Sequence, residues 1–143
     1  MMDSLNSLVV FSLQGEKYAL YLRNVAEVVE PPRFFPMPHA PLFFVGIINS
    51  HGNLVSLLDL AHFLTNAPRN PQGKVLVLDR GVANLALWVD MVENVNSAAV
   101  ILEEYESDET LVGKVLIMAD GEVKILSVEK LLEQLEQIFS EGS

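Results

Sequence analysis

Apolar and polar positions alternate along most of the chain, and clusters of turn-forming residues separate the apolar runs. Residues 7–22, SLVVFSLQGEKYALYL, hold two apolar runs on either side of a turn at residues 14–16, which predicts two strands. Residues 43–60 hold two more runs around the cluster NSHGN. Gly52 in this cluster can adopt a positive φ, so the stretch predicts a β-hairpin that carries His51 at its tip.

The second half of the chain repeats this strand-rich pattern. The stretches KVLVLDRG, NLALWVDMVENV and KVLIMADGEVKILSV each read as strands with turns, and Asp120-Gly121 in the last is a strong hairpin signal. Trp88 lies in an apolar strand and is expected in the core. These runs predict further short strands after residue 73.

Four stretches do not fit simple strands. Residues 23–30, RNVAEVVE, are compatible with a strand or with a short helical turn. Residues 31–41 contain five prolines, which exclude a helix interior and a central strand and indicate an extended connection. Residues 60–66 suggest one or two helical turns. Residues 67–73, APRNPQG, have the composition of a linker.

The last element is an amphipathic helix. Ser127 can cap its N-terminus, and apolar residues follow at helical spacing: Val128, Leu131, Leu132, Leu135, Ile138 and Phe139. With many short strands before it, the pattern predicts a mainly β, sandwich or barrel architecture. We expect one domain over 1–143, with two similar halves at roughly 8–66 and 74–139 that can be intertwined.

Composition narrows the classes of function. The chain of 143 residues carries 19 acidic and 9 basic residues, a formal charge of −10, which disfavours binding to nucleic acid or to an anionic membrane surface. It has no cysteine, so disulfides and thiolate chemistry are excluded. The longest apolar run, PLFFVGII, is too short for a membrane helix, which needs about 20 residues. We therefore expect a soluble, cytoplasmic protein without membrane insertion.

No catalytic or metal site is predicted. His51 and Asp59 would lie at opposite ends of one strand, which argues against a catalytic pair. The three histidines lack the spacing of a helical metal site, and no motif of a serine nucleophile or a phosphate-binding loop is present. The acidic run at Glu103–Glu109 lacks the pattern of a calcium loop and is interpreted as a solvated loop. We expect no enzyme activity, no cofactor and no metal.

The order of these segments resembles the CheW-like family. VVFSLQGEKYALYLRNVAEVVE and GIINSHGNLVSLLDL are similar to its first half: strand, glycine turn, a strand ending in V-x-E, then G-hydrophobic-x-N-x-R-G and a closing D-L. KVLVLDRG, LALWVDMVENV and GEVKILSVEKLL are similar to its second half. The resemblance covers roughly residues 8 to 133.

The resemblance implies two five-stranded SH3-like β-barrels packed on a shared core, with short helices and a C-terminal helix. It implies a non-enzymatic adaptor that couples the cytoplasmic tips of chemoreceptors to the regulatory domain of the histidine kinase CheA. A receptor helix would lie in the apolar groove between the barrels. By position, the partner-binding residues would be Val25, Glu27, Gly46, His51, Val92 and Val95.

Three positions depart from the family pattern. His51 replaces the arginine before the turn glycine, Ser56 replaces a proline, and the loop around Glu103–Glu109 is shorter. In the family the arginine pairs with the acid that corresponds to Glu27, and histidine does not provide the same fixed charge and bidentate geometry. The resemblance therefore places His51 on a partner surface, opposite Glu27.

Three other interpretations remain open at this point. The chain could be a CheW paralogue that serves an array outside chemotaxis. It could be a small-molecule-binding β-barrel that the segment FFPMPHAPLFF covers. It could also be a module that docks only on its own kind.

Overall fold

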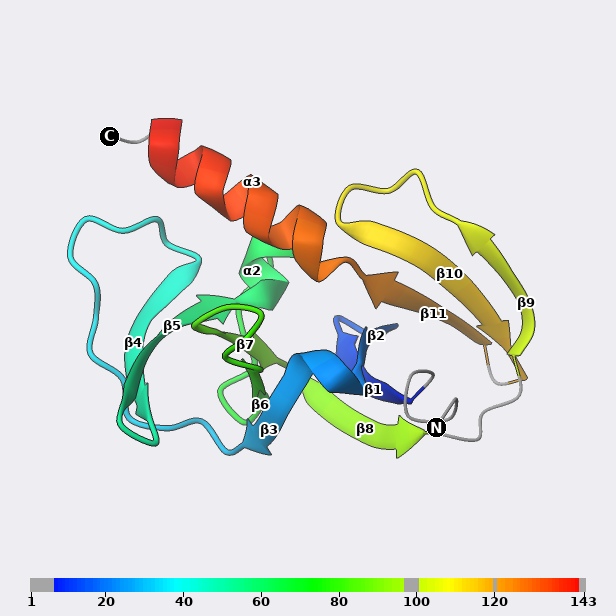
Figure 1. The fold of residues 1–143 in the computed structure, drawn as a ribbon, viewed down its shortest axis with the longest axis horizontal. Helices are drawn as coiled ribbons and strands as arrows, with labels where there is room; N and C mark the ends of the chain where they lie inside the picture. The colour runs from blue at the N-terminus through cyan, green and yellow to red at the C-terminus, as the bar shows by residue number, and fades with distance from the viewer. Residues whose placement is uncertain (1–6, 97–100, 120, 142–143) are drawn as a thin grey trace.

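The computed structural model of the chain describes residues 7–96, 101–119 and 121–141. Its strands form two antiparallel-rich sheets, one of six strands in the order β8-β1-β2-β11-β10-β9 and one of five strands in the order β3-β6-β7-β5-β4. Figure 1 shows the two sheets on opposite sides of the molecule, with the C-terminal helix α3 leading from the end of β11 toward the side of the five-stranded sheet. The fold is mainly β, as the sequence predicts.

The six-stranded sheet combines the N-terminal hairpin with the C-terminal strands. Its strands are β1 (Leu8–Leu13), β2 (Glu16–Tyr21), β8 (Met91–Asn96), β9 (Ile101–Glu106), β10 (Val112–Met118) and β11 (Gly121–Leu126). β2 pairs in parallel with β11, which joins the first strands of the chain to the last. One end of the chain thus completes a sheet that the other end begins.

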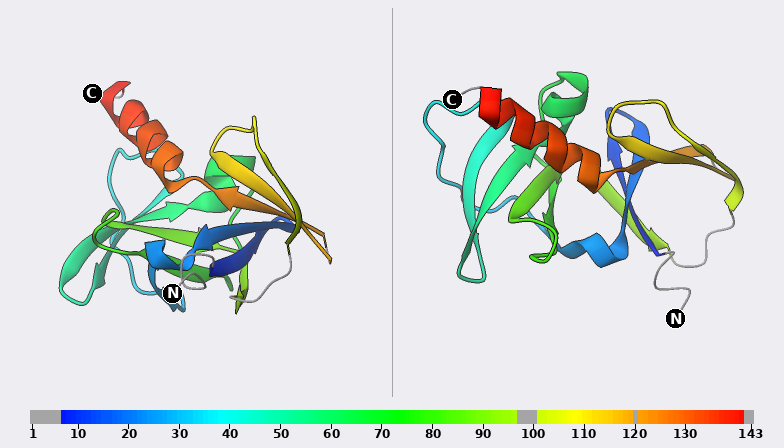
Figure 2. Two further views of the ribbon diagram at one scale, coloured as in Figure 1. Left: turned by 45° about the vertical axis from the view of Figure 1, so that its right-hand side comes forward. Right: turned by 45° about the horizontal axis from the view of Figure 1, so that its top comes forward.

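The five-stranded sheet holds the middle of the chain. Its strands are β3 (Val25–Val29), β4 (Phe44–Ser50), β5 (Asn53–Asp59), β6 (Lys74–Leu78) and β7 (Leu85–Val89), and β5 pairs in parallel with β7. A short 3-10 helix, η1 (Leu22–Asn24), leads into β3, and helix α2 (Leu60–Thr65) follows β5. Figure 2 shows α2 and α3 at the same end of this sheet, opposite the tip of the β4–β5 hairpin.

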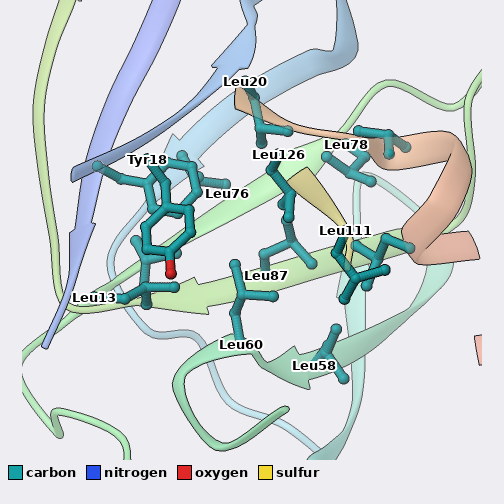
Figure 3. Packing of buried hydrophobic residues seen from close by; sticks show 14 of the residues in the cluster. Leu13, Tyr18, Leu20, Leu58, Leu60, Leu76, Leu78, Leu87, Leu111 and Leu126 are labelled. Carbon is teal, nitrogen blue, oxygen red and sulfur yellow. The ribbon is translucent and has the colours of Figure 1, made fainter. Parts of the chain in front are cut away.

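A shared hydrophobic core lies between the two sheets. It includes Leu13 and Leu126 from the six-stranded sheet and Leu58 and Leu87 from the five-stranded sheet, all almost fully buried (Figure 3). Full burial of one such side chain contributes about 1.5–3 kcal/mol, so this cluster holds the two sheets together. Smaller buried clusters around Leu57 and Ile125 fill the other face of each sheet.

Helix α3 (Val128–Glu141) begins where the sequence predicts. The Ser127 hydroxyl accepts a hydrogen bond from the backbone N–H of Lys130 at 3.2 Å, which is an N-cap. Leu131 and Leu135 are buried in the shared core, whereas Phe139 near the end of the helix is partly exposed. Only one stripe of helix residues therefore packs against the shared core.

Several details differ from the sequence analysis. The interpretation of Glu103–Glu109 as a loop was wrong for its first half, because β9 extends to Glu106 and pairs with β10. All six β9 residues are exposed, so alternation of apolar and polar residues could not identify a strand that buries neither face.

The number of strands also differs, because one sheet has six strands where five were expected. The undecided residues 23–30 form η1 and strand β3. Asp120 of the predicted hairpin lies outside the described residues, but β10 and β11 pair as that hairpin requires.

Candidate functional site

The tip of the β4–β5 hairpin is a two-residue turn. Ser50 pairs with Asn53, and the residues between them, His51 and Gly52, both have a positive φ, 52° and 88°. A turn with positive φ at both central positions matches the right-handed twist of the strands and favours asparagine or glycine. The Asn49 side-chain oxygen accepts the Gly52 N–H at 2.8 Å and supports the turn.

Histidine at the first turn position is held in a strained conformation. A left-handed conformation outside glycine costs about 1–3 kcal/mol and is maintained only by its surroundings. The His51 side chain is 79% exposed, so packing does not explain its presence. The contact between its imidazole and the Glu27 carboxylate is the interaction that holds it in this conformation.

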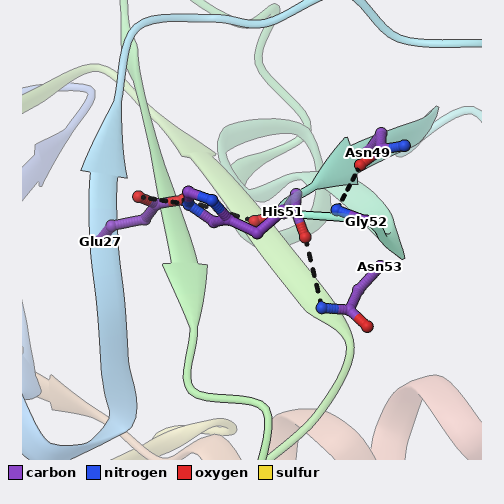
Figure 4. Close-up of polar contacts among 6 residues, drawn as sticks. Glu27, Asn49, His51, Gly52 and Asn53 are labelled. Carbon is purple, nitrogen blue, oxygen red and sulfur yellow. Dashed lines mark hydrogen bonds and ion pairs between the residues drawn. The ribbon is translucent and has the colours of Figure 1, made fainter.

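Glu27 lies on β3 and reaches across to the hairpin tip. The His51 Nε2 atom lies 3.1 Å from Glu27 Oε1 and 3.3 Å from Oε2, and the Ser50 hydroxyl donates to Oε1 at 3.4 Å (Figure 4). The Glu27 side chain is 34% exposed, so its carboxylate is partly withdrawn from solvent. The structure therefore brings together the acid and the histidine that the resemblance placed opposite each other.

Two hollows flank this pair. One, of about 270 Å³, has Val55, Val77 and Ala83 as apolar lining and Arg80 among its polar lining. The other, of about 250 Å³, is lined by Val29, Pro32 and Ile48 beside the same pair. The pair thus separates two shallow recesses with apolar floors, a shape that suits side chains of a partner protein better than a buried small molecule.

Arg80 is a residue of this site that the sequence reasoning missed. It follows Asp79 in the β6–β7 connection, it is exposed, and within the described part of the chain it has no ion pair. The signal available in the sequence was only a turn composition, DRG, and the pairing of β6 with β3 was needed to bring Arg80 near Glu27.

The remaining predicted residues are distributed around the shared core. Val25 on β3 and Val92 on β8 are partly buried and pack against the same core cluster. Val95 pairs with Val9 in the β1–β8 ladder, and its side chain lies outside the described residues. The structure therefore places Val25 and Val92 at one border of the core, with Val25 two residues before Glu27 on β3.

Gly46 has a local structural reason to be glycine. It is buried in β4, and a Cβ atom there would overlap the carbonyl group of Phe35. Phe35 forms a bridge with Ile47 through two backbone hydrogen bonds of 2.8 Å, so the proline-rich segment lies directly on β4. A partner could reach Gly46 only through this segment.

The site offers few groups for chemistry. His51 and Asp59 lie before and at the end of β5, which is seven residues long, so about 20 Å separates its ends. No group of three or more potential metal ligands occurs among residues 7–96, 101–119 and 121–141. The same residues include no helix that is long and apolar enough to cross a membrane. What the site presents is a contact between a carboxylate and an imidazole, an exposed guanidinium and apolar recesses.

Residues 7–136 match the CheW-like domain family. The chain belongs to this family. It is 26% identical over 143 aligned residues to a probable chemotaxis protein CheW of Rhizobium etli, covering 94% of this chain and 87% of that protein. It is 30% identical over 84 residues to the protein PilI of Pseudomonas aeruginosa, covering 57% of this chain and 47% of PilI.

The fold is also that of a solved CheW. The scaffolding protein TtCheW of Thermoanaerobacter tengcongensis superposes with a TM-score of 0.69 and 25% identity, covering 85% of this chain and 88% of that protein. The two sheets described above correspond to the two SH3-like subdomains of this CheW-like fold. The expected fold and family are confirmed.

Proposed function

We propose that this CheW-like chain is the scaffold that couples the cytoplasmic tips of chemoreceptors to the regulatory domain of a CheA-type histidine kinase. The observation that carries the proposal is the Glu27–His51 pair between two apolar recesses at the tip of an exposed hairpin. The His51 side chain is 79% exposed and contributes no packing, so it is available for contacts outside the chain.

The surface around the pair supports a protein partner. Apolar floors beside Val77 would take apolar side chains, and the partly exposed carboxylate and Arg80 would fix their orientation through hydrogen bonds. We assign this region, with Glu27, His51 and the segment over Gly46, to partner binding.

The border of the shared core supports a second contact. Val25 and Val92 are apolar and incompletely buried, which suits the docking of an amphipathic receptor helix. We include Val95, which follows on the same strand, in this groove. The kinase domain would then bind at the hairpin tip and the receptor at the border of the shared core, two regions that adjoin each other on β3.

Scaffolding requires no chemistry of its own. We propose that the chain is not an enzyme, that it uses no cofactor, and that it acts in the cytoplasm, where receptor tips and kinase meet. Support comes from the family membership and from the similarity to TtCheW, which is itself described as a scaffolding protein.

The direct test is calorimetry with the regulatory domain of the CheA-type kinase from the same organism. Saturable, equimolar binding is expected, and Val25→Ser should leave it unchanged while weakening binding of a receptor-tip fragment. Absence of kinase binding by a folded protein would contradict the proposal. Equal loss of both partners in Val25→Ser would show that the two contacts are not separate.

The similarity to PilI supports a second candidate, a CheW paralogue that serves an array outside chemotaxis. His51 in place of the family arginine agrees with a partner different from the usual one. A comparison of binding to each CheA-type kinase of the organism distinguishes the candidates, because a paralogue should prefer a kinase other than the chemotaxis kinase.

A further inference from the structure

A larger cavity lies at the other end of β5 from the hairpin tip. It has a volume of about 580 Å³ and is bounded by the start of α2, by the connection that follows it and by β7. The residues that give it chemical character are Asp59, His62, Asn66, Arg69 and Trp88. Because β5 separates this cavity from Glu27 and His51 by about 20 Å, it is a different site from the one proposed above.

Asp59 places a buried carboxylate in this cavity. Only 3% of its side chain is exposed, although it is the last residue of a strand. Its Oδ1 atom accepts the backbone N–H of His62 at 3.1 Å and caps α2. Its Oδ2 atom is less well satisfied, because the nearest cationic group, Nη1 of Arg69, lies 3.8 Å away. A buried carboxylate with such a long contact retains capacity for a closer cationic donor.

Trp88 provides an aromatic wall next to Asp59. The two residues pair across β5 and β7, and the Trp88 indole N–H donates to the Asn70 carbonyl at 2.8 Å, which fixes the ring. The Arg69 guanidinium lies over this ring, 4.9 Å from its centroid. A carboxylate beside an aromatic face is the combination that binds guanidinium groups, through charge and through the ring quadrupole.

The charges around the cavity favour a cation. Asp90, two residues after Trp88, acts on Asp59 as a second negative charge. The Oδ2 atom of Asp90 accepts the Gln14 N–H at 2.7 Å, whereas its buried Oδ1 atom has no hydrogen-bond partner among the described residues. Asp59 is thus the one carboxylate among the described lining residues of the cavity, with Arg69 and His62 as its other titratable groups, and Asp90 adds negative charge from outside the lining.

Arg69 fills this site only loosely. Its side chain is 38% exposed, its ion pair with Asp59 is long, and it belongs to the irregular connection between α2 and β6. That connection is fixed at the next residue by the Asn70–Trp88 hydrogen bond and does not depend on Arg69. The Arg69 side chain could therefore leave the cavity while the backbone stays in place.

We propose that the Asp59–Trp88 cavity is a binding site for an arginine side chain of a partner protein, and that Arg69 is an internal occupant that this side chain displaces. The incoming guanidinium would form the close contact with Asp59 Oδ2 that Arg69 does not make, and would stack on Trp88 in its place. The acidic surface of the chain, with a net charge of −10, favours the approach of a basic segment.

The single tryptophan of the chain gives a specific readout, because Trp88 lies in the cavity itself. N-acetyl-arginine amide serves as the probe for an arginine within a protein, and tryptophan fluorescence is titrated at constant ionic strength. Arg69→Ala removes the internal competitor, so we expect saturable binding about tenfold tighter than to the wild-type chain. Arg69→Gln serves as a second variant of near-native size, and thermal melting establishes that each variant is folded.

Two controls isolate the chemistry. N-acetyl-citrulline amide has the same shape without the charge and should not bind. Adding Asp59→Asn to Arg69→Ala retains the helix cap but removes the carboxylate, and should weaken arginine binding at least about tenfold. This test uses neither kinase nor receptor, so its outcome is independent of the proposed scaffold function.

Three results would overturn the proposal. The first is the absence of saturable binding in folded Arg69→Ala and Arg69→Gln proteins. The second is equal binding of the citrulline and arginine probes. The third is a preference for free arginine over the capped amide, which would identify a small-molecule ligand in place of a protein partner.

Discussion

The Glu27 carboxylate and the His51 imidazole, 24 residues apart in the sequence, meet with 3.1 Å between Oε1 and Nε2. Strand β3 and the β4–β5 hairpin, which carry them, lie at the two edges of one five-stranded sheet. The pair therefore joins the two edges of the sheet, and the edge of β4 is itself partly covered by the bridge between Phe35 and Ile47.

Glu27→Gln should weaken partner binding and leave the fold intact. The amide keeps the shape but loses the charge that holds His51, so we expect kinase affinity to fall about tenfold. Because the pair is largely exposed, the free energy of unfolding should change by only about 0–1 kcal/mol. Calorimetry and thermal melting measure the two quantities. The matched control is Glu133→Gln on the exposed face of α3, and an equal loss of affinity there would contradict the assignment.

His51 should contribute to partner binding through its contact with Glu27. His51→Ala removes the imidazole and should weaken kinase binding about tenfold. His51→Arg places a fixed charge and a bidentate donor opposite the carboxylate and should retain the affinity. Calorimetric titration of the wild type and both variants checks this, and equal affinities for all three proteins would make His51 an ordinary turn residue.

Gly46→Ala should destabilise the fold. The added methyl group would overlap the Phe35 carbonyl and push the proline-rich segment off β4. Such overpacking costs about 1–3 kcal/mol. Gly113→Ala is the control, because a Cβ there would meet its nearest atom only at 3.8 Å. Chemical denaturation should give a clearly lower free energy of unfolding for Gly46→Ala. Equal free energies for the two variants would show that the proline-rich segment can move aside without a loss of stability.

Asp59 should make stability decrease as pH rises through its titration. Burial raises the pKa of Asp59 above its ordinary 3.8, Asp90 adds to this, and the His62 N–H and Arg69 only partly offset it. The folded protein then holds this proton more tightly than the unfolded chain, so the contribution of Asp59 to stability falls between 3.8 and the raised pKa.

Asp59→Asn keeps the helix cap and removes the titration. The difference in unfolding free energy between wild type and variant should therefore shift in favour of the variant as pH rises through this window. Asp108→Asn, the same substitution at an exposed position, is the matched control. If the difference in unfolding free energy instead shifted in favour of the wild type as pH rises, the ion pair with Arg69 would have a larger effect on the pKa of Asp59 than burial has.

Local patterns predicted most elements of the fold. The Gln14-Gly15 turn, the hairpin around His51 and the Ser127 cap each follow from a few neighbouring residues whose backbone preferences are strong. The approach of His51 to Glu27 came from the family resemblance, since no local pattern reports a contact between two strand edges.

Non-local features could not be predicted from the chain alone. The parallel pairing of β2 with β11 joins segments more than 100 residues apart, as the contact between Glu16 and Lys124 illustrates. Strand β9 was not predicted from the sequence because it buries neither face. The Asp59–Arg69–Trp88 cluster depends on the path of the connection after α2, which its linker composition does not specify.

The central claim is that this chain joins receptor and kinase in one complex. Co-sedimentation of receptor-bearing membranes with the CheA-type kinase of the same organism, with and without this protein, tests it most directly. We predict that the kinase sediments with the receptors when the wild-type chain is present, and much less when Glu27→Gln replaces it. Sedimentation of the kinase that is the same in the presence and absence of the wild-type chain would contradict the account.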